Sequence, residues 1–222
     1  MSFAVEVWPS GRYAAAAAGW IAERMPGSGS LVLTGGGAAE KLYPAMHPDL
    51  SDVDIFFSDE RCVPPDHQAS NFALAHRLLL DRSGASRVHR MRGEDPPIRA
   101  ARAYHDELVP AVARGFDLAL LGMGDDNHIA ALFPNSPALI DPDALCLPVD
   151  RPDGLKGLTM TAPALVAARA IVLIVTGAAK AEAVRRAVKS DDDPLSCPVR
   201  LLAGHPDATF LLDEPAAALL QG

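Results

Sequence analysis

Short apolar runs alternate along the chain with longer helical patterns. The runs predict strands at 3–8, 31–33, 53–57, 118–121, 171–175 and 210–212. The other patterns predict helices from Ser10 up to Pro26-Gly27, at 38–46, after a cap at Ser70, and at 98–114, 178–188 and 215–220. Strand, turn and helix recur at least four times, which predicts a mostly parallel sheet with helices on both faces. We therefore expect an α/β protein with a single modified doubly wound, Rossmann-like domain over residues 1–222.

Polar and glycine residues gather directly after four of the predicted strands. The segments concerned are 34–37, 58–61, 122–128 and 176–180. Ligands of doubly wound sheets bind beyond the carboxyl ends of the strands, where such segments emerge. The pattern therefore predicts that these four segments meet in one cleft.

Composition narrows the possible classes of protein. The 222 residues carry a formal net charge of −8, and no basic face stands out that would bind nucleic acid or an anionic membrane. The three cysteines are odd in number and far apart, which argues against a disulfide framework and fits a reducing cytoplasm. No apolar run is long enough to span a bilayer, the first residues lack the pattern of a signal peptide, and no zinc-binding motif is present. We expect a cytoplasmic protein without a metal.

Three glycines follow the second predicted strand. Gly35, Gly36 and Gly37 would let the backbone approach a ligand closely and direct N–H groups at an anion. A tight turn without a ligand explains the same residues equally well, and the Walker lysine and the dinucleotide-binding spacing are both missing. Lys180, at the start of a later helix, could add a point charge to a phosphate or be an ordinary exposed lysine. The residues alone leave these alternatives open.

Charged side chains follow the third and fourth predicted strands. Arg61 could hold a carboxylate or an oxyanion with Asp59 beside it, although a solvated acidic turn is the more common explanation of such a motif. His128 follows Asp126 by two residues in a glycine-flanked turn after a buried strand. A histidine that an aspartate orients is the usual general base near neutral pH. We expect the other six histidines, which lack such surroundings, to be surface or structural residues.

Taken together, these segments resemble the 6-phosphogluconolactonase branch of the glucosamine-6-phosphate isomerase and deaminase superfamily. The matching blocks are LTGGG at 33–37, SDERCVP at 58–64 with SN at 70–71, GMGDDNH at 122–128 continuing to ALFP at 131–134, LTMT at 158–161 and TGAAK at 176–180. They run in the family's order and cover nearly the whole chain. The second and third blocks are highly specific in combination.

The resemblance implies a hydrolase that converts 6-phospho-D-glucono-1,5-lactone to 6-phospho-D-gluconate, a step of the oxidative pentose phosphate pathway. It also implies that no metal or organic cofactor is needed. His128 would activate water, Asp126 would orient it, and Arg61 would lie near the lactone. The further implied contacts to substrate and phosphate are Asp59, Asn71, Lys180 and the three glycines. The expected partner is a small phosphorylated sugar lactone, and we expect a monomer or weak homodimer.

Several positions depart from the family's pattern. Gly37-Ala38 stands where hydroxyl residues are usual, so a side-chain contact to phosphate is missing. Asn127 stands where glycine is usual, and asparagine tolerates a positive φ better than most residues. Gly157 stands where arginine commonly precedes the Thr-Met-Thr stretch, and Lys156 beside it could substitute as a point charge. We expect these changes to affect substrate affinity more than the fold.

Two alternative functions belong to other classes. A glucosamine-6-phosphate deaminase or isomerase-like enzyme has an Asn-Glu pair where this chain has Leu132-Phe133, which cannot transfer protons. A non-catalytic sugar-phosphate-sensing domain is usually joined to a DNA-binding helix-turn-helix, and this acidic chain has no residues for one before its first predicted strand. Because Asp126 and His128 are both present, hydrolysis is the preferred interpretation.

Overall fold

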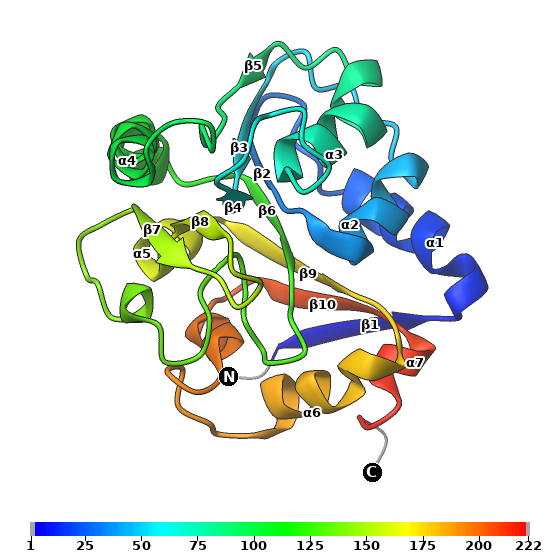
Figure 1. Ribbon diagram of the computed structural model, residues 1–222. Coiled ribbons are helices and arrows are strands. Elements are labelled where there is room, and N and C mark those ends of the chain that lie inside the picture. Colours follow the sequence, from blue (N-terminus) through cyan, green and yellow to red (C-terminus); the bar gives the residue numbers. More distant parts are fainter. Residues whose placement is uncertain (1–2, 221–222) are drawn as a thin grey trace.

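A seven-stranded sheet forms the centre of the computed structural model, which describes residues 3–220 (Figure 1). Its strands are β1 (Ala4–Trp8), β2 (Gly29–Leu33), β3 (Val53–Phe57), β5 (Arg87–Val88), β6 (Leu118–Gly122), β9 (Ala170–Val175) and β10 (Ala208–Asp213). They lie in the order β1-β10-β9-β6-β2-β3-β5, and every neighbouring pair is parallel. The sheet confirms the predicted α/β class and the predicted strands.

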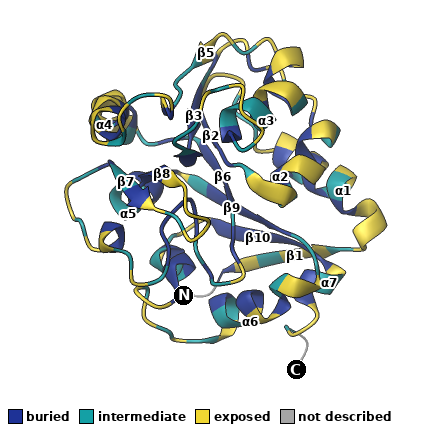
Figure 2. Ribbon diagram, in the orientation of Figure 1, coloured by how far each residue is buried: buried dark blue, intermediate teal, exposed yellow. Residues whose placement is uncertain are grey.

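Helices pack on both faces of this sheet because successive strand residues point to opposite sides. Leu31 and Leu33 of β2 pack with helices α1 (Ser10–Ala22), α2 (Gly36–Leu42) and α3 (Asn71–Leu78) in one apolar cluster. Val32, between them, belongs to a second cluster on the other face. That face is covered by α4 (Pro97–Arg114), α5 (Ala162–Leu165), α6 (Ala181–Lys189) and α7 (Glu214–Ala217). Figure 2 shows the central strands buried and the outer faces of the helices exposed.

Three further strands form a small antiparallel sheet that the apolar pattern does not predict. They are β4 (Asp59–Arg61), β7 (Cys146–Asp150) and β8 (Lys156–Met160), in the order β4-β8-β7. The segment 59–61 was expected to be part of a turn, but it pairs with β8 directly after β3 ends. This pairing sets Arg61 opposite Gly157, and it therefore shapes one wall of the cleft described below.

The helix ends follow local signals only in part. The first helix ends at Ala22 rather than near Pro26, and the last, expected at 215–220, spans Glu214–Ala217. The oxygen of the Ser70 side chain accepts the N–H of Ala73 at 3.1 Å, which confirms the predicted cap. The helix predicted at 38–46 begins earlier, at Gly36, and changes to a 3₁₀ turn at Tyr43–Ala45, where Pro44 lacks the N–H that an α-helix needs. The helix predicted at 178–188 likewise opens with a 3₁₀ turn, Ala178–Lys180, before α6.

The helices of the structure are also relevant to membrane insertion. Within residues 3–220, none combines the length and the apolar character needed to cross a bilayer.

Candidate active site

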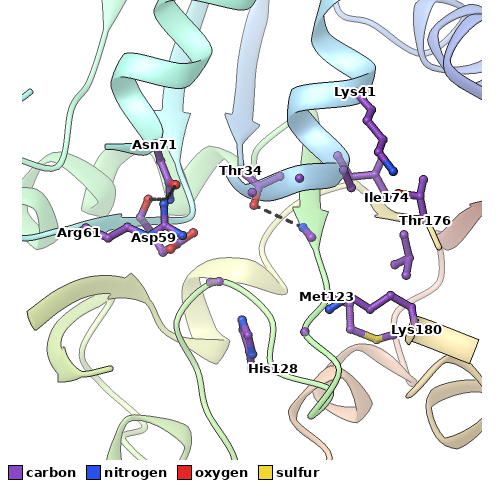
Figure 3. Close-up of a pocket in the computed structure, with 18 of the residues that line it drawn as sticks. Thr34, Lys41, Asp59, Arg61, Asn71, Met123, His128, Ile174, Thr176 and Lys180 are labelled. Atoms are coloured by element: carbon purple, nitrogen blue, oxygen red, sulfur yellow. Dashed lines mark hydrogen bonds between the residues drawn. The ribbon is translucent and has the colours of Figure 1, made fainter. Parts of the chain in front are cut away.

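A cleft of about 300 Å³ lies at the carboxyl edge of the large sheet (Figure 3). Its walls come from the segments after β2, β3, β6 and β9, so the structure brings together the four segments that were predicted to meet. The predicted site residues in the walls are Gly35, Gly36, Gly37, Asp59, Arg61, Asn71, His128 and Lys180. Asp126 is not part of the wall, and it reaches the site through His128.

His128 and Asp126 form a hydrogen-bonded pair. His128 Nδ1 lies 2.5 Å from Asp126 Oδ1, and the same oxygen accepts the backbone N–H of His128 at 3.1 Å. Because an ionised carboxylate can only accept hydrogen bonds, Nδ1 is the donor in this bond, and in the neutral imidazole Nε2 then keeps a free lone pair. Partial burial raises the pKa of Asp126, but the hydrogen bonds and charge of His128 lower it more, so it lies below the usual value. The pair can therefore present an unprotonated ring nitrogen to a water molecule.

The turn that carries this pair depends on Gly124 and Asn127. A Cβ atom at Gly124 would lie 2.1 Å from His128 Nδ1 and 2.5 Å from Asp126 Oδ1, so a larger residue would displace both side chains. Asn127 is buried with φ 68°, and its Nδ2 donates to the carbonyl oxygen of Ala183 in α6 at 2.6 Å. The expectation that Asn127 supports a tight turn at positive φ is confirmed. The same residue also ties the turn to the helix that follows Lys180.

The glycine loop begins α2 at the mouth of the cleft. Gly36 has φ 84°, and within residues 3–220 no side chain caps this helix. A hydrogen bond from the protein interior stabilises the loop: the Tyr43 hydroxyl donates to the carbonyl oxygen of Thr34 at 2.7 Å. Thr34 Oγ1 in turn accepts the N–H of Gly122 at 3.3 Å, which joins the ends of β2 and β6. The loop is therefore fixed to the sheet while its backbone faces the cleft.

Two cationic side chains lie at one end of the cleft. Figure 3 shows Lys41 and Lys180 at this end with Thr176, and His128 between them and the group formed by Asp59, Arg61 and Asn71. Lys180 Nζ lies 4.0 Å from Asp125 Oδ1. Sequence reasoning missed Lys41 and Thr176. The available signal for Lys41 was its position four residues after Gly37, which places both on one face of a helix.

Arg61 and Asn71 connect the opposite end to the glycine loop. Arg61 Nη1 donates to the Ala69 carbonyl oxygen at 2.8 Å and to Asn71 Oδ1 at 2.7 Å. Asn71 Nδ2 donates to the carbonyl oxygen of Asp59 at 2.9 Å. Asn71 also packs on Gly35, where an added Cβ would lie 1.8 Å from Asn71 Oδ1. The amide thus sets the position of Arg61 relative to the loop.

Glu60 supports this end from the protein interior. Its carboxylate accepts the Ser70 hydroxyl and three backbone N–H groups, those of Arg61, Asn71 and Phe72, at 2.7–2.9 Å. Burial raises the pKa of Glu60, and these four donors offset part of that effect. All of these bonds hold protein groups, so Glu60 fixes β4 to the start of α3. The sequence motif had left open whether an arginine is held beside a carboxylate here or the segment is a solvated acidic turn.

The structure does not bring Lys156 to the cleft, which corrects the expectation that it replaces a missing arginine. Lys156 faces Asp150 across the β7–β8 hairpin, pairs with its carboxylate and is 63% exposed. Neighbouring strand residues point to opposite faces, so Lys156 cannot occupy the side of β8 that Gly157 faces. Arg151, in the turn between β7 and β8, lines the cleft instead, with Nη1 3.7 Å from Asp59 Oδ2.

Possible metal ligands were also compared in space. Across the described residues, 3–220, no three His, Cys, Asp or Glu side chains are grouped so that they could hold a metal ion.

Comparisons with known proteins point to one family. Residues 11–211 match the family model described as glucosamine-6-phosphate isomerases/6-phosphogluconolactonase. The chain belongs to this family. It is 35% identical to the 6-phosphogluconolactonase of Mycobacterium tuberculosis, over 99% of each chain. It is 36% identical to that of Synechocystis, over 90% of this chain and 88% of the relative.

Solved structures share the same fold. A 6-phosphogluconolactonase from Trypanosoma cruzi superposes with a TM-score of 0.86 at 24% identity, over 100% of this chain and 99% of the other. A monomeric glucosamine-6-phosphate deaminase superposes with a TM-score of 0.85 at 20% identity, over 98% and 100%. Both branches of the family therefore have this architecture, and the fold alone does not separate their reactions.

Proposed function

We propose that this protein is a 6-phosphogluconolactonase that hydrolyses its lactone with a water molecule activated by His128. The observation that carries the mechanism is the hydrogen-bonded pair of His128 and Asp126, with His128 in the wall of the cleft. The substrate class is supported by relatives named 6-phosphogluconolactonase that are about 35% identical over nearly the whole chain. The geometry of the site and the similarity to known 6-phosphogluconolactonases therefore support the same reaction.

The reaction begins when a water oxygen attacks C1 of the lactone. His128 Nε2 takes a proton from that water, and the carbonyl oxygen becomes an oxyanion. As the tetrahedral intermediate collapses, the bond between C1 and the ring oxygen breaks, and the imidazolium returns its proton to that oxygen. The product is an open-chain acid, which ionises at neutral pH. Asp126 orients the imidazole and stabilises its charged form.

Direct attack by water fits the side chains of the cleft better than a covalent intermediate. Among the described residues that line it, none is serine or cysteine. Cys62 lies outside the wall, and burial raises the pKa of its thiol, which disfavours a nucleophilic thiolate. A lactone carbonyl is already electrophilic, so the roughly 10²–10⁴-fold contribution of a positioned base suffices for most of the catalysis.

The phosphate binds at the lysine end in this proposal. No hydroxyl is present at Gly37 or Ala38, so the N–H groups of the glycine loop and the cationic side chains of Lys41 and Lys180 supply the contacts. Lys180 is 27% exposed, which leaves its ammonium accessible to a ligand. With phosphate at this end, the lactone extends past His128 toward Asp59.

The oligomeric state and the cellular location are also part of this proposal. We expect the protein to be a monomer or weak homodimer. All three cysteines are free thiols, which suits the proposed cytoplasmic location.

The decisive experiment measures two reactions on the purified protein. Freshly generated 6-phosphogluconolactone should be hydrolysed well above its spontaneous rate, and glucosamine 6-phosphate should release no ammonia. Leu132 and Phe133 are buried and apolar, so no group there can assist the proton transfer that deamination needs. Ammonia release without lactone hydrolysis would replace this function with the deaminase reaction, and activity on neither substrate would refute catalysis.

A further inference from the structure

The side chain of Arg151 reaches the cleft although the residue belongs to the turn between β7 and β8. Its aliphatic stem crosses β8 at Gly157, where an added Cβ would lie 3.0 Å from Arg151 Cδ and 3.2 Å from Cγ. Gly157 is the residue that pairs with Arg61 of β4. The missing side chain at Gly157 therefore leaves the path along which Arg151 enters the wall of the site.

Three contacts fix the guanidinium. Arg151 Nη1 lies 3.7 Å from Asp59 Oδ2, and Nε lies 3.2 Å from Asp153 Oδ2. Its Cζ lies 5.5 Å from the centre of the Phe133 ring, and that ring centre lies 4.6 Å from the centre of the His128 ring. These neighbours place Arg151 at the end of the cleft that holds Asp59, away from the two lysines.

The guanidinium is available to a ligand. The Arg151 side chain is only 8% exposed, so its charge interacts more strongly than a fully solvated charge would. Within the part of the chain that the structure describes, Arg151 donates one hydrogen bond, from Nε, and none from Nη2, whereas Arg61 donates two from Nη1 and has a buried Nε without a partner. Arg151 therefore has a guanidinium nitrogen that can donate to a ligand.

We propose that Arg151 binds the C1 end of the ligand: the oxyanion during hydrolysis and the carboxylate of the product. This proposal rests on the proposed function, because that function places C1 beside His128. A planar guanidinium matches the two oxygens of a carboxylate, which a lysine ammonium does not. Arg151 then makes the site specific for a sugar acid phosphate, while Lys41 and Lys180 hold the phosphate.

Two ligands that differ only at C1 test this assignment. 6-Phosphogluconate carries a carboxylate there, and sorbitol 6-phosphate carries a hydroxymethyl group. Arg151→Ala should weaken binding of 6-phosphogluconate about 10- to 100-fold, the typical loss of a charge-assisted hydrogen bond, and leave sorbitol 6-phosphate nearly unaffected. Lys180→Ala should weaken both ligands. Equal losses for the two ligands in Arg151→Ala, or no loss for either, would overturn the proposal.

Matched variants keep this test interpretable. Lys156→Ala removes a cation from the same hairpin but outside the cleft, and it should change neither affinity. Arg151→Ala with Gly157→Arg returns a guanidinium to the wall from β8, and it should restore part of the lost affinity for 6-phosphogluconate. If Arg151→Ala does not fold, Arg151→Lys keeps a cation beside Asp59 and should lose affinity for 6-phosphogluconate alone.

The binding measurement also separates this proposal from the proposed function. Calorimetry with the product needs no turnover, so the contrast between the two ligands can be read even in a protein that hydrolyses nothing. A wild-type protein without lactonase activity would refute the function, whereas a missing contrast would refute only the role of Arg151.

Discussion

Replacing Gly124 with alanine should disable the proposed base without altering the histidine itself. The new Cβ would lie 2.1 Å from His128 Nδ1, 2.3 Å from its Cε1 and 2.5 Å from Asp126 Oδ1. Ordinary van der Waals contact begins at 3.4 Å, so the imidazole must move by more than about 1 Å. The substitution would therefore displace the side chains of both His128 and Asp126.

The structure sets the size of the expected effect. A misplacement of about 1 Å in a catalytic group costs about 10²-fold, so kcat should approach the value of His128→Ala. KM should change little, because the phosphate end of the cleft lies elsewhere. The side chains of His128 and Asp126 are 28% and 41% exposed and can move toward solvent. The loss in unfolding free energy should therefore lie near the lower end of the range of about 1–3 kcal/mol for overpacking.

A double-mutant cycle tests this reasoning. Lactone hydrolysis is measured for the wild type, Gly124→Ala, His128→Ala and the double variant, with the spontaneous rate subtracted and folding checked by thermal unfolding. If the methyl group acts only through the imidazole, the double variant is no slower than His128→Ala. Wild-type turnover in Gly124→Ala, or losses that multiply in the double variant, would refute the mechanism.

Other consequences concern the base, the phosphate and the turn. His128→Ala should lower kcat at least about 10²-fold with little change in KM, and retained turnover would exclude it as the base. The lowered pKa of Asp126 should keep its carboxylate ionised at mildly acidic pH, so Asp126→Asn should lower kcat there as well as at neutral pH, and an unchanged kcat would contradict this. Lys180→Ala should raise KM for the phosphorylated lactone and barely affect unphosphorylated gluconolactone, and equal effects would remove it from the phosphate site. Asn127→Ala should lower the free energy of unfolding by about 2 kcal/mol in urea titration, because it combines positive φ with the lost bond to Ala183. Asn127→Gly should lose less, and a larger loss would contradict this account.

The sequence by itself determined the layers of the fold. A strand covered on both faces is apolar along its whole length, so the run at 118–121 predicted β6, observed at Leu118–Gly122, without knowledge of its neighbours. The cap at Ser70 was likewise predictable, because it depends on the residue itself and its nearest neighbours. The positive φ at Asn127 was expected from the family resemblance, which usually has glycine at this position. The burial pattern and the local backbone preferences depend on residues that are near one another in the sequence, so they can be predicted without knowledge of tertiary contacts.

The proposed catalytic pair can also be predicted from the sequence. Asp126 and His128 are two residues apart, so one short turn can bring the carboxylate to the imidazole. Parallel strand order then placed this turn and the glycine loop at one edge of the sheet, since the carboxyl ends of parallel strands share an edge. The location of the cleft could therefore be predicted from the sequence.

Only the tertiary structure decided which cation stands beside Asp59. Lys156 adjoins Gly157 in the sequence, but the register of the β7–β8 hairpin turns it outward to Asp150. Arg151, six residues before Gly157, enters the cleft because the hairpin folds it back across β8. In a strand, a shift of one residue moves a side chain to the opposite face, and register is set by pairing between distant segments. The order of residues within 146–160 does not by itself predict which residue of β7 pairs with which residue of β8.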